Sequence, residues 1–272
     1  MLICEDGRTI GSLSAGCLEE EVATRAHNVL KTGEPAIMSF DTQRRFGCDG
    51  KIDIFIERAS EKFLSNLAAH LDARRSCLAV TTFEGSSVGE AGSFLSQNET
   101  VRENWEANSF PCSPFMQEIH PPIRLLIFGD GPENPPLCSL GDLLGWQVIE
   151  ILDTAAFSFE RDEWTAAIVK SHNYGRDFVA LQNFLSLDLR YVGLIGPRKR
   201  RDQLLNELLD QDVTINAGFF SPAGIDLGGE TPAEIALEIV SEIQRVFAHG
   251  SGDSLRERKM SIHAAQCKIS AR

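Results

Sequence analysis

Two cysteines beside glycines are the first residues in this chain that could do chemistry. Cys17 follows Gly16 at the start of a predicted helix, and Cys48 lies in the glycine turn 47–50. A helix N-terminus stabilises a thiolate, so Cys17 is a candidate nucleophile or soft-metal ligand. Three acids at 19–21 oppose that effect, and two cysteines alone are too few for a zinc site. From spacing alone, two small apolar fillers are the favoured interpretation.

A basic run at 198–201 could bind an anion. It follows a predicted strand, Tyr191 to Gly196, and opens a predicted helix, where cations oppose the helix dipole. A phosphate on the turn between Gly193 and Gly196 would accept backbone N–H groups and pair with Arg198. A solvated basic surface in an acidic protein explains the run equally well.

A glycine turn follows the apolar segment 124–128 and opens a βαβ pattern. Gly129 and Gly131 allow a tight turn and close approach of a phosphate. The next apolar strand ends on Asp153, roughly 20 residues on, where an acid can bond a ribose hydroxyl. The sequence therefore predicts a Rossmann-like unit.

The same turn departs from the dinucleotide-binding pattern. Asn134 stands at the third glycine position. With Asn134 as N-cap and Pro135 as the first helical residue, a helix is still predicted there. Asp130 and Glu133 place negative charge beside the expected phosphate. These charges argue against a dinucleotide at this turn, and the basic turn at Arg198 is the alternative phosphate site.

Two further polar segments are candidates for a ligand site. His172 and Asp177 come just after the strand Thr165 to Ser171, at the end where ligands bind in open α/β sheets. His172 is a candidate base or heterocycle contact, but a loop histidine is more often bonded to backbone, and no nucleophilic triad can be assembled around it. The loop from Ser221 to Asp226 either borders a ligand site or turns the chain.

Alternating strands and helices must position these residues. The predicted strands lie at 124–128, 147–153, 165–171 and 191–196, and helical periods lie at 176–187 and 198–209. This alternation is typical of parallel α/β winding. A last helix begins at Thr231, where Pro232 and Glu234 form a proline-containing capping box.

Shorter elements upstream predict a small α+β domain. They are strands at 8–13, 51–57 and 77–82 and helices at 17–30 and 62–71. A proline-rich break separates this part from the glycine turn. We therefore expect an N-terminal α+β domain at 1–110, a linker at 111–122, a Rossmann-like three-layer domain with a parallel sheet at 123–248, and a flexible tail at 249–272.

Composition limits the class of protein. The chain has 272 residues, of which 43% are hydrophobic and 24% charged, enough for two cores. Its net charge of -13 argues against nucleic acid or an anionic membrane as a partner. No apolar run reaches the roughly 20 residues of a membrane span, and no signal segment opens the chain. Seven cysteines include no CxxC pair, so we expect a cytoplasmic protein with reduced thiols.

Five sequence blocks together resemble the XdhC/CoxI family. They are Gly11–Glu19, Gly47–Gly50, Ser171–Tyr174, Tyr191–Arg198 and Ser221–Gly228. The last two, followed by the segment 231–236, are the most specific. The resemblance extends from Met1 to about Phe247.

The resemblance implies a small domain joined to a Rossmann-like domain, usually as a homodimer. It implies an accessory protein without turnover chemistry of its own, which binds molybdenum cofactor as molybdopterin or its dinucleotide form. Such a protein helps to sulfurate and protect the cofactor and delivers it to a molybdenum hydroxylase such as xanthine dehydrogenase. A cysteine desulfurase is a further implied partner. Family members usually carry a segment ahead of Met1, so the first domain is expected to lack its opening segment.

The same resemblance assigns roles to residues. Cys17 and Cys48 become the candidates for the molybdenum end of the cofactor, Arg198 for its phosphate, and His172 with Asp177 for the pterin. The expected cofactor-binding residues are Cys17, Cys48, Gly129, Gly131, Asp153, His172, Asp177, Gly193, Gly196, Arg198, Ser221 and Asp226.

Two other functions fit parts of the sequence. A NAD(P)-dependent oxidoreductase is suggested by the Gly129 turn and Asp153, although the pattern supplies neither a third glycine nor a clear proton donor. The remaining alternative is a Rossmann-like interaction module that has lost its ligand.

Overall fold

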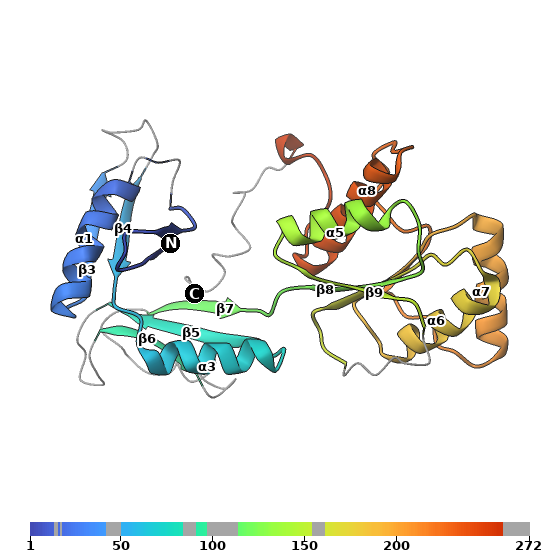
Figure 1. Ribbon diagram of the computed structural model, residues 1–272, viewed down its shortest axis with the longest axis horizontal. Coiled ribbons are helices and arrows are strands. Elements are labelled where there is room, and N and C mark those ends of the chain that lie inside the picture. Colours follow the sequence, from blue (N-terminus) through green and yellow to red (C-terminus); the bar gives the residue numbers. More distant parts are fainter. Residues whose placement is uncertain are drawn as a thin grey trace. The chain divides into compact units, whose positions relative to one another are not determined.

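The computed structural model describes residues 1–13, 16, 18–41, 50–83, 91–96, 114–153 and 161–257. They form two compact units that divide in the sequence between Ile119 and His120 (Figure 1). No sheet and no buried apolar cluster of the described residues is shared between the two units.

A five-stranded parallel sheet forms the centre of the C-terminal unit. Its strands are β8 (Arg124–Phe128), β9 (Gln147–Ile151), β10 (Thr165–Val169), β11 (Tyr191–Leu194) and β12 (Phe219–Phe220). Their order across the sheet is β12-β11-β10-β8-β9, and every neighbouring pair is parallel. Strand β9 pairs with one edge of β8, and β10 pairs with the other edge. The loops that follow β8 and β10 are therefore neighbours at the carboxyl edge of the sheet.

Helices cover both faces of this sheet (Figure 1). Helices α5 (Asn134–Leu143) and α8 (Pro232–Phe247) pack on one face, and α6 (Tyr174–Ser186) and α7 (Arg198–Asp210) pack on the other. Strand β10 is buried along its whole length, because a parallel sheet covered on both faces has no solvent side. The predicted Rossmann-like three-layer fold is confirmed.

Helix α8 begins as its sequence predicts. The Thr231 side chain accepts a hydrogen bond from Glu234 N at 3.3 Å, and Glu234 Oε2 accepts one from Thr231 N at 2.8 Å. This reciprocal pair is the predicted capping box, with Pro232 in the first helical turn.

Three strands end earlier than the sequence pattern suggests. β9 ends at Ile151, β10 at Val169 and β11 at Leu194. The residues that follow each of these strands leave the sheet and form its carboxyl edge. The short strand β12, which pairs with β11, is not predicted from the sequence because only two of its residues join the sheet.

The N-terminal unit is a mixture of helices and antiparallel strands. Helix α1 (Glu19–Thr32) packs on the pair β3 (Ala36–Asp41) and β4 (Lys51–Ile56). Val22, Ala26 and Val29 of α1 share one buried cluster with residues of both strands, as expected for residues three and four apart on a helix. This is the small α+β domain that the sequence predicts.

The rest of this unit contains a second sheet. Helix α3 (Glu61–Asp72) accompanies the antiparallel strands β6 (Gly92–Ser96), β5 (Cys77–Thr82) and β7 (Phe115–Ile119). The strands β1 (Leu2–Ile3) and β2 (Thr9–Ile10) form a separate pair. Strand β7 lies inside the segment 111–122 that the sequence marks as a linker, because pairing with β5 makes it part of the sheet.

No helix in the described ranges has the length and apolarity needed to cross a membrane. Beyond α8, the described chain contains one short 3-10 helix, Leu255–Glu257. The remainder of the expected tail lies outside the described residues.

Tyr191 is a buried polar tie between the sheet and α8. Its ring stacks on Phe220 with ring centres 4.7 Å apart, and its hydroxyl donates to Glu242 Oε2 at 2.8 Å. The same oxygen accepts a hydrogen bond from Gly224 N at 2.8 Å. Burial, together with the Glu242 carboxylate, raises the pKa of Tyr191 well above its usual range, so its hydroxyl remains a donor at neutral pH.

Replacement of this tyrosine tests the tie. Tyr191→Phe should lower the free energy of unfolding by about 1–3 kcal/mol, because it leaves a buried carboxylate with one donor fewer. Tyr174, the other tyrosine of the chain, donates to Glu207 at 2.7 Å on the surface, and Tyr174→Phe should cost under about 0.5 kcal/mol. Urea unfolding followed by circular dichroism measures both losses. Equal losses for the two variants would contradict the buried tie.

Candidate functional site

The end of β8 touches the end of β10 at Gly129. A Cβ on Gly129 would lie 2.6 Å from Ser171 Cα and 2.8 Å from the carbonyl carbon of Lys170. Gly129 also has a positive φ of 108°, which favours glycine. Close approach of two protein backbones therefore requires glycine at this position.

The space above Gly131 is filled by a side chain. A Cβ on Gly131 would lie 2.6 Å from Lys170 Nζ and 3.0 Å from Glu133 Oε2. Lys170 is completely buried, and its ammonium lies 3.0 Å from Glu133 Oε2 and donates to Asn134 Oδ1 at 2.7 Å. An internal ion pair thus occupies the position where the glycine pattern predicts a phosphate.

Asn134 is not the N-cap of α5, and that part of the sequence prediction is wrong. The helix begins at Asn134, and Glu133 stands at the N-cap without a side-chain cap. The Asn134 amide is buried and donates to Gly129 O at 3.1 Å and to the Glu150 carboxylate. Its oxygen is used by Lys170, so the side chain joins the turn to β9 and β10 instead of capping its own helix.

The carboxyl group of Glu133 is held in its charged form. Partial burial alone would raise its pKa, but the hydrogen bond and charge of Lys170, the backbone of Glu133 and the charge of His172 bring the pKa below its usual range. His172 follows Ser171, which lies against Gly129 of this turn. Its φ of 55° turns the chain out of β10, and its side chain is exposed.

Asp177 ties β10, α6 and α7 together. It is completely buried and accepts hydrogen bonds from Ser171 N at 3.0 Å and from the Ser171 hydroxyl. Its other oxygen accepts from the Arg200 guanidinium. Because both oxygens are used inside the protein, Asp177 can influence a ligand only through Ser171 and Arg200.

The loop before α6 is fixed by its own side chains. Asn173 is the N-cap and accepts from Arg176 N at 3.1 Å. The Arg176 guanidinium donates to Leu152 O at 2.6 Å and lies over the Phe128 ring, 5.3 Å from its centre. The exposed His172 is thus presented by a rigid segment.

The basic run opens α7 with two exposed cations. Arg198 and Lys199 are exposed and have no hydrogen-bond or ion-pair partner among the residues that the structure describes. Pro197 occupies the N-cap and supplies no side-chain cap to the N–H groups of the first turn. Gly196 lies in the turn itself. This end of α7 therefore offers unpaired N–H groups and positive charge together.

Gly193 lies inside β11, outside the turn that the sequence assigns to it. A Cβ there would lie 2.9 Å from the Tyr191 ring and 3.0 Å from Ala223 Cβ. The glycine makes room for that packing. Gly193 is therefore a strand residue and is not part of the turn that contains Gly196 and Arg198.

Carboxylates along one side of α8 hold the loop that contains Ser221 and Asp226. Glu238 Oε1 accepts from Leu227 N at 3.0 Å and from Gly229 N at 2.7 Å. Glu234 accepts hydrogen bonds from the backbone N–H groups of residues 230 and 231. Glu242 accepts one from the N–H of residue 224.

One end of this loop, at Ser221, is attached to α7, and the other end, at Asp226, is exposed to solvent. Ser221 O accepts from Arg201 at 3.2 Å, which attaches the loop to α7. Asp226 is exposed.

The sequences of known proteins identify the family. Residues 125–243 match the XdhC Rossmann domain, and residues 1–41 match the XdhC and CoxI family. Together the two matches cover more than half of the chain. The chain belongs to the XdhC and CoxI family. The Rossmann-domain match begins in β8 and ends in α8, so it contains the whole carboxyl edge.

Relatives and one solved structure extend the likeness to most of the chain. The chain is 27% identical over 296 residues to a probable xanthine dehydrogenase subunit of Bacillus subtilis (strain 168), covering 89% of this chain and 86% of that protein. It is 26% identical over 279 residues to the molybdenum cofactor insertion chaperone PaoD of Escherichia coli (strain K12), covering 93% and 79%. The crystal structure of a xanthine dehydrogenase from Bacillus halodurans shares the fold, with a TM-score of 0.74 at 23% identity over 97% of this chain and 88% of that chain.

The structure gives only limited information on three of the expected site residues. Cys17 and Cys48 lie outside the described residues. Asp153 follows the end of β9 and is exposed. Within the described ranges, no group of three or more His, Cys, Asp or Glu side chains could hold a metal ion.

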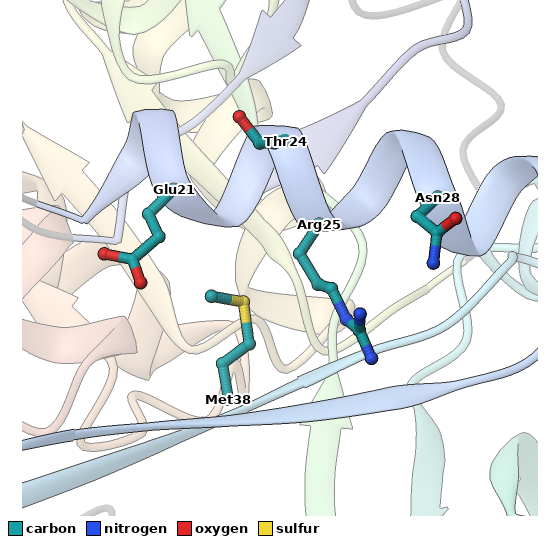
Figure 2. Close-up of a pocket in the computed structure, with 5 residues that line it drawn as sticks. All are labelled: Glu21, Thr24, Arg25, Asn28 and Met38. Atoms are coloured by element: carbon teal, nitrogen blue, oxygen red, sulfur yellow. The ribbon is translucent and has the colours of Figure 1, made fainter.

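The family segment at the N-terminus contains a shallow hollow of about 390 Å³ between α1 and β3. Figure 2 shows Glu21 and Arg25 pointing from α1 toward the side where Met38 rises from β3. The hollow is open, and its lining brings together charges of both signs. Its residues are not among those that the sequence marks for chemistry.

Sequence reasoning missed Lys170 and the pairing of Arg200 with Asp177, which hold the carboxyl edge in place. A lysine directly after the fully apolar strand β10 was a usable signal, because lysine is almost never fully buried unless it is paired. Arg200 belongs to the basic run 198–201, but nothing in the sequence indicated its pairing with Asp177, since only the fold brings the two together.

The Asp177 tie can be tested by neutralising the carboxylate. Asp177→Asn should lower the free energy of unfolding by about 2–4 kcal/mol, because it leaves the largely buried Arg200 without its anion. Asp202, which pairs with the neighbouring Arg201 at 2.6 Å near the surface, provides the control. Asp202→Asn should change stability by under about 0.5 kcal/mol. Urea unfolding compares the two, and a small loss for Asp177→Asn would show that the tie is weak.

Proposed function

We propose that this chain is an accessory factor that holds molybdenum cofactor as cargo and delivers it to a molybdenum hydroxylase of the xanthine dehydrogenase type. Membership of the XdhC and CoxI family supports this proposal, as do the names of its two relatives. The cofactor supplies redox chemistry to the hydroxylase. The chain itself binds, orients and releases it, without turnover chemistry of its own.

The observation that carries the proposal is the open, basic first turn of α7. Molybdopterin ends in a phosphate, and its dinucleotide form contains a diphosphate. The uncapped N–H groups after Pro197 and the exposed guanidinium of Arg198 suit either anion. The turn after β8 is less suitable, because Glu133 and Lys170 already fill it. We therefore assign the phosphate end of the cargo to the Gly196–Arg198 turn.

The pterin would lie along the edge from this turn toward His172. The exposed imidazole of His172 can hydrogen-bond a heterocycle, and the buried Asp177 holds Ser171 and Arg200 in place beside it. Ser221 and Asp226 would border the same region from the loop that α8 fixes.

The metal end of the cargo would be handled by thiols. We propose Cys17 and Cys48 for this role because a soft metal-dithiolene group favours sulfur ligands. A cysteine desulfurase would be the partner that supplies sulfur for sulfuration. The factor would act as a homodimer in the cytoplasm, where its hydroxylase partner is assembled.

A NAD(P)-dependent oxidoreductase is the rival function. It would need a phosphate at the Gly129–Gly131 turn, where the Lys170 and Glu133 ion pair stands. Titration of the purified chain with NAD(H) and NADP(H) separates the two functions. Saturable binding of either nucleotide at micromolar concentration would favour the rival.

Removal of the Arg198 guanidinium tests the phosphate assignment. Arg198→Ala should weaken retention of molybdenum cofactor about 10- to 100-fold, because one charge-assisted hydrogen bond to an anion is lost. The measurement is gel filtration of the cofactor-loaded chain, followed by assay of molybdenum and pterin in the protein peak. Activation of an apo-hydroxylase by the loaded chain should fall in parallel.

Arg161 provides a matched control at the opposite, amino edge of the same sheet. It is exposed and pairs with Asp188 at 2.8 Å. Arg161→Ala removes the same charge from the same unit and should leave cofactor retention within about twofold. Equal losses for Arg161→Ala and Arg198→Ala would mean that general charge, and not the α7 turn, holds the cargo.

Cysteine substitution tests the metal end separately. Cys48→Ala should leave pterin retention nearly unchanged but reduce transfer of active, sulfurated cofactor to the apo-hydroxylase at least about tenfold, because a soft ligand is lost. Cys4→Ala is the control, since Cys4 is a partly exposed free thiol that has no proposed role. Full transfer by Cys48→Ala would remove Cys48 from the site.

A further inference from the structure

The ion pair between Lys170 and Glu133 stands where a dinucleotide fold binds phosphate. In such folds the second glycine of the turn lets the backbone approach a diphosphate, which rests on the N-terminus of the following helix. Here that glycine is Gly131 and that helix is α5. The Glu133 carboxylate lies 3.0 Å from the Cβ position of Gly131 and stands at the N-cap of α5. A protein carboxylate therefore holds the place of the ligand anion.

The buried cation below this carboxylate requires an anion. Lys170 is completely buried, so its ammonium has lost its hydration. An unpaired charge in such a place is very costly, and buried lysines are paired for that reason. Within the described part of the chain, its partners are the Glu133 carboxylate and the neutral Asn134 amide oxygen. Glu133 is thus the only negative charge in direct contact with the ammonium among the described residues.

The carboxylate is attached only lightly to the rest of the turn. Its side chain is partly exposed, and Oε2 has no hydrogen-bond partner among the described residues apart from the ion pair with Lys170. Asn134, in contrast, is fixed from three sides by Gly129, Glu150 and Lys170. The contacts of Asn134 therefore hold the turn without help from Glu133, although loss of the Glu133 carboxylate leaves the Lys170 ammonium without its anion.

We propose that Glu133 is a built-in anion that closes the β8–α5 turn against nucleotide diphosphates, and that removal of its charge converts Lys170 and this turn into a diphosphate-binding site. A tethered carboxylate competes at a high effective concentration, so a free diphosphate gains little in the wild-type chain. Without that carboxylate, the buried ammonium, the α5 N-terminus and the Gly131 backbone would all face the ligand. Glu133 is then the residue that sets which anion the Rossmann-like unit accepts, independently of the cargo held at α7.

Isothermal titration with inorganic pyrophosphate tests this assignment in the full chain. Glu133→Ala should bind pyrophosphate about 10- to 100-fold more tightly than the wild-type chain, as expected when a charge-assisted site becomes free. The double variant Glu133→Ala with Lys170→Met should return to the wild-type affinity, because the ammonium is gone and no buried charge is left unpaired. Arg198 is intact in all these proteins, so any binding at α7 is a common background.

Asp130 supplies the matched control. It is an exposed acid in the same turn, and Asp130→Ala removes one negative charge without touching Lys170. Its affinity for pyrophosphate should stay within about threefold of the wild-type value. An equal gain for Asp130→Ala would overturn the proposal, because general charge would then explain the effect.

A second variant covers the case in which Glu133→Ala fails to fold. Glu133→Gln keeps an oxygen for Lys170 and removes only the charge, and its thermal midpoint should rise on addition of pyrophosphate more than that of the wild-type chain. If folded Glu133→Ala or Glu133→Gln binds pyrophosphate no better than the wild-type chain, the proposal is wrong. It is equally wrong if the wild-type chain binds pyrophosphate tightly through Lys170. Neither result touches the proposed cofactor delivery, whose test uses molybdenum cofactor and Arg198.

Discussion

Parallel pairing of β8 with β10 is the constraint on which the carboxyl edge depends. Phe128 is aligned with Val169, so the chain that leaves β8 runs directly against Lys170 and Ser171. Only glycine fits at 129 under that condition. The Lys170 side chain is enclosed beneath the turn, away from water, and an anion has to accompany it. Glu133 and Asn134 supply the partners, and the turn is closed as a result.

Carboxylates act as internal ties throughout the C-terminal unit. Asp177 joins β10 to α7, Glu242 joins Tyr191 to the loop at Gly224, and Glu238 holds the same loop further along. The net charge of -13 therefore does not describe a uniformly acidic surface, because part of the negative charge lies inside. Loops held in this way lose little further freedom when they meet a ligand, which favours binding.

Two turns at the carboxyl edge differ in their charged groups: the turn after β8 contains a paired cation and anion, and the turn after β11 leads into exposed cations. The turn after β8 has the glycines of a nucleotide-binding fold but contains its own anion. The turn after β11 departs from that pattern, yet it leads into exposed cations and uncapped N–H groups. The same Rossmann-like architecture can thus take its ligand at a different place. A fold of this kind locates the edge at which to search, and the side chains there decide the chemistry.

The sequence by itself determined the features that depend on neighbours along the chain. Apolar runs and helical periods were sufficient for the parallel α/β winding, and Thr231 to Glu234 for the capping box of α8. Only the tertiary structure decided the partner of Lys170, the true role of Asn134 and the position of β7, because each depends on contacts between segments far apart in the sequence. Lys170 and Asn134 are 36 positions apart, and nothing local in either segment specifies that they meet. Local patterns encode helices and strands, whereas strand register and burial decide which polar side chains must satisfy one another.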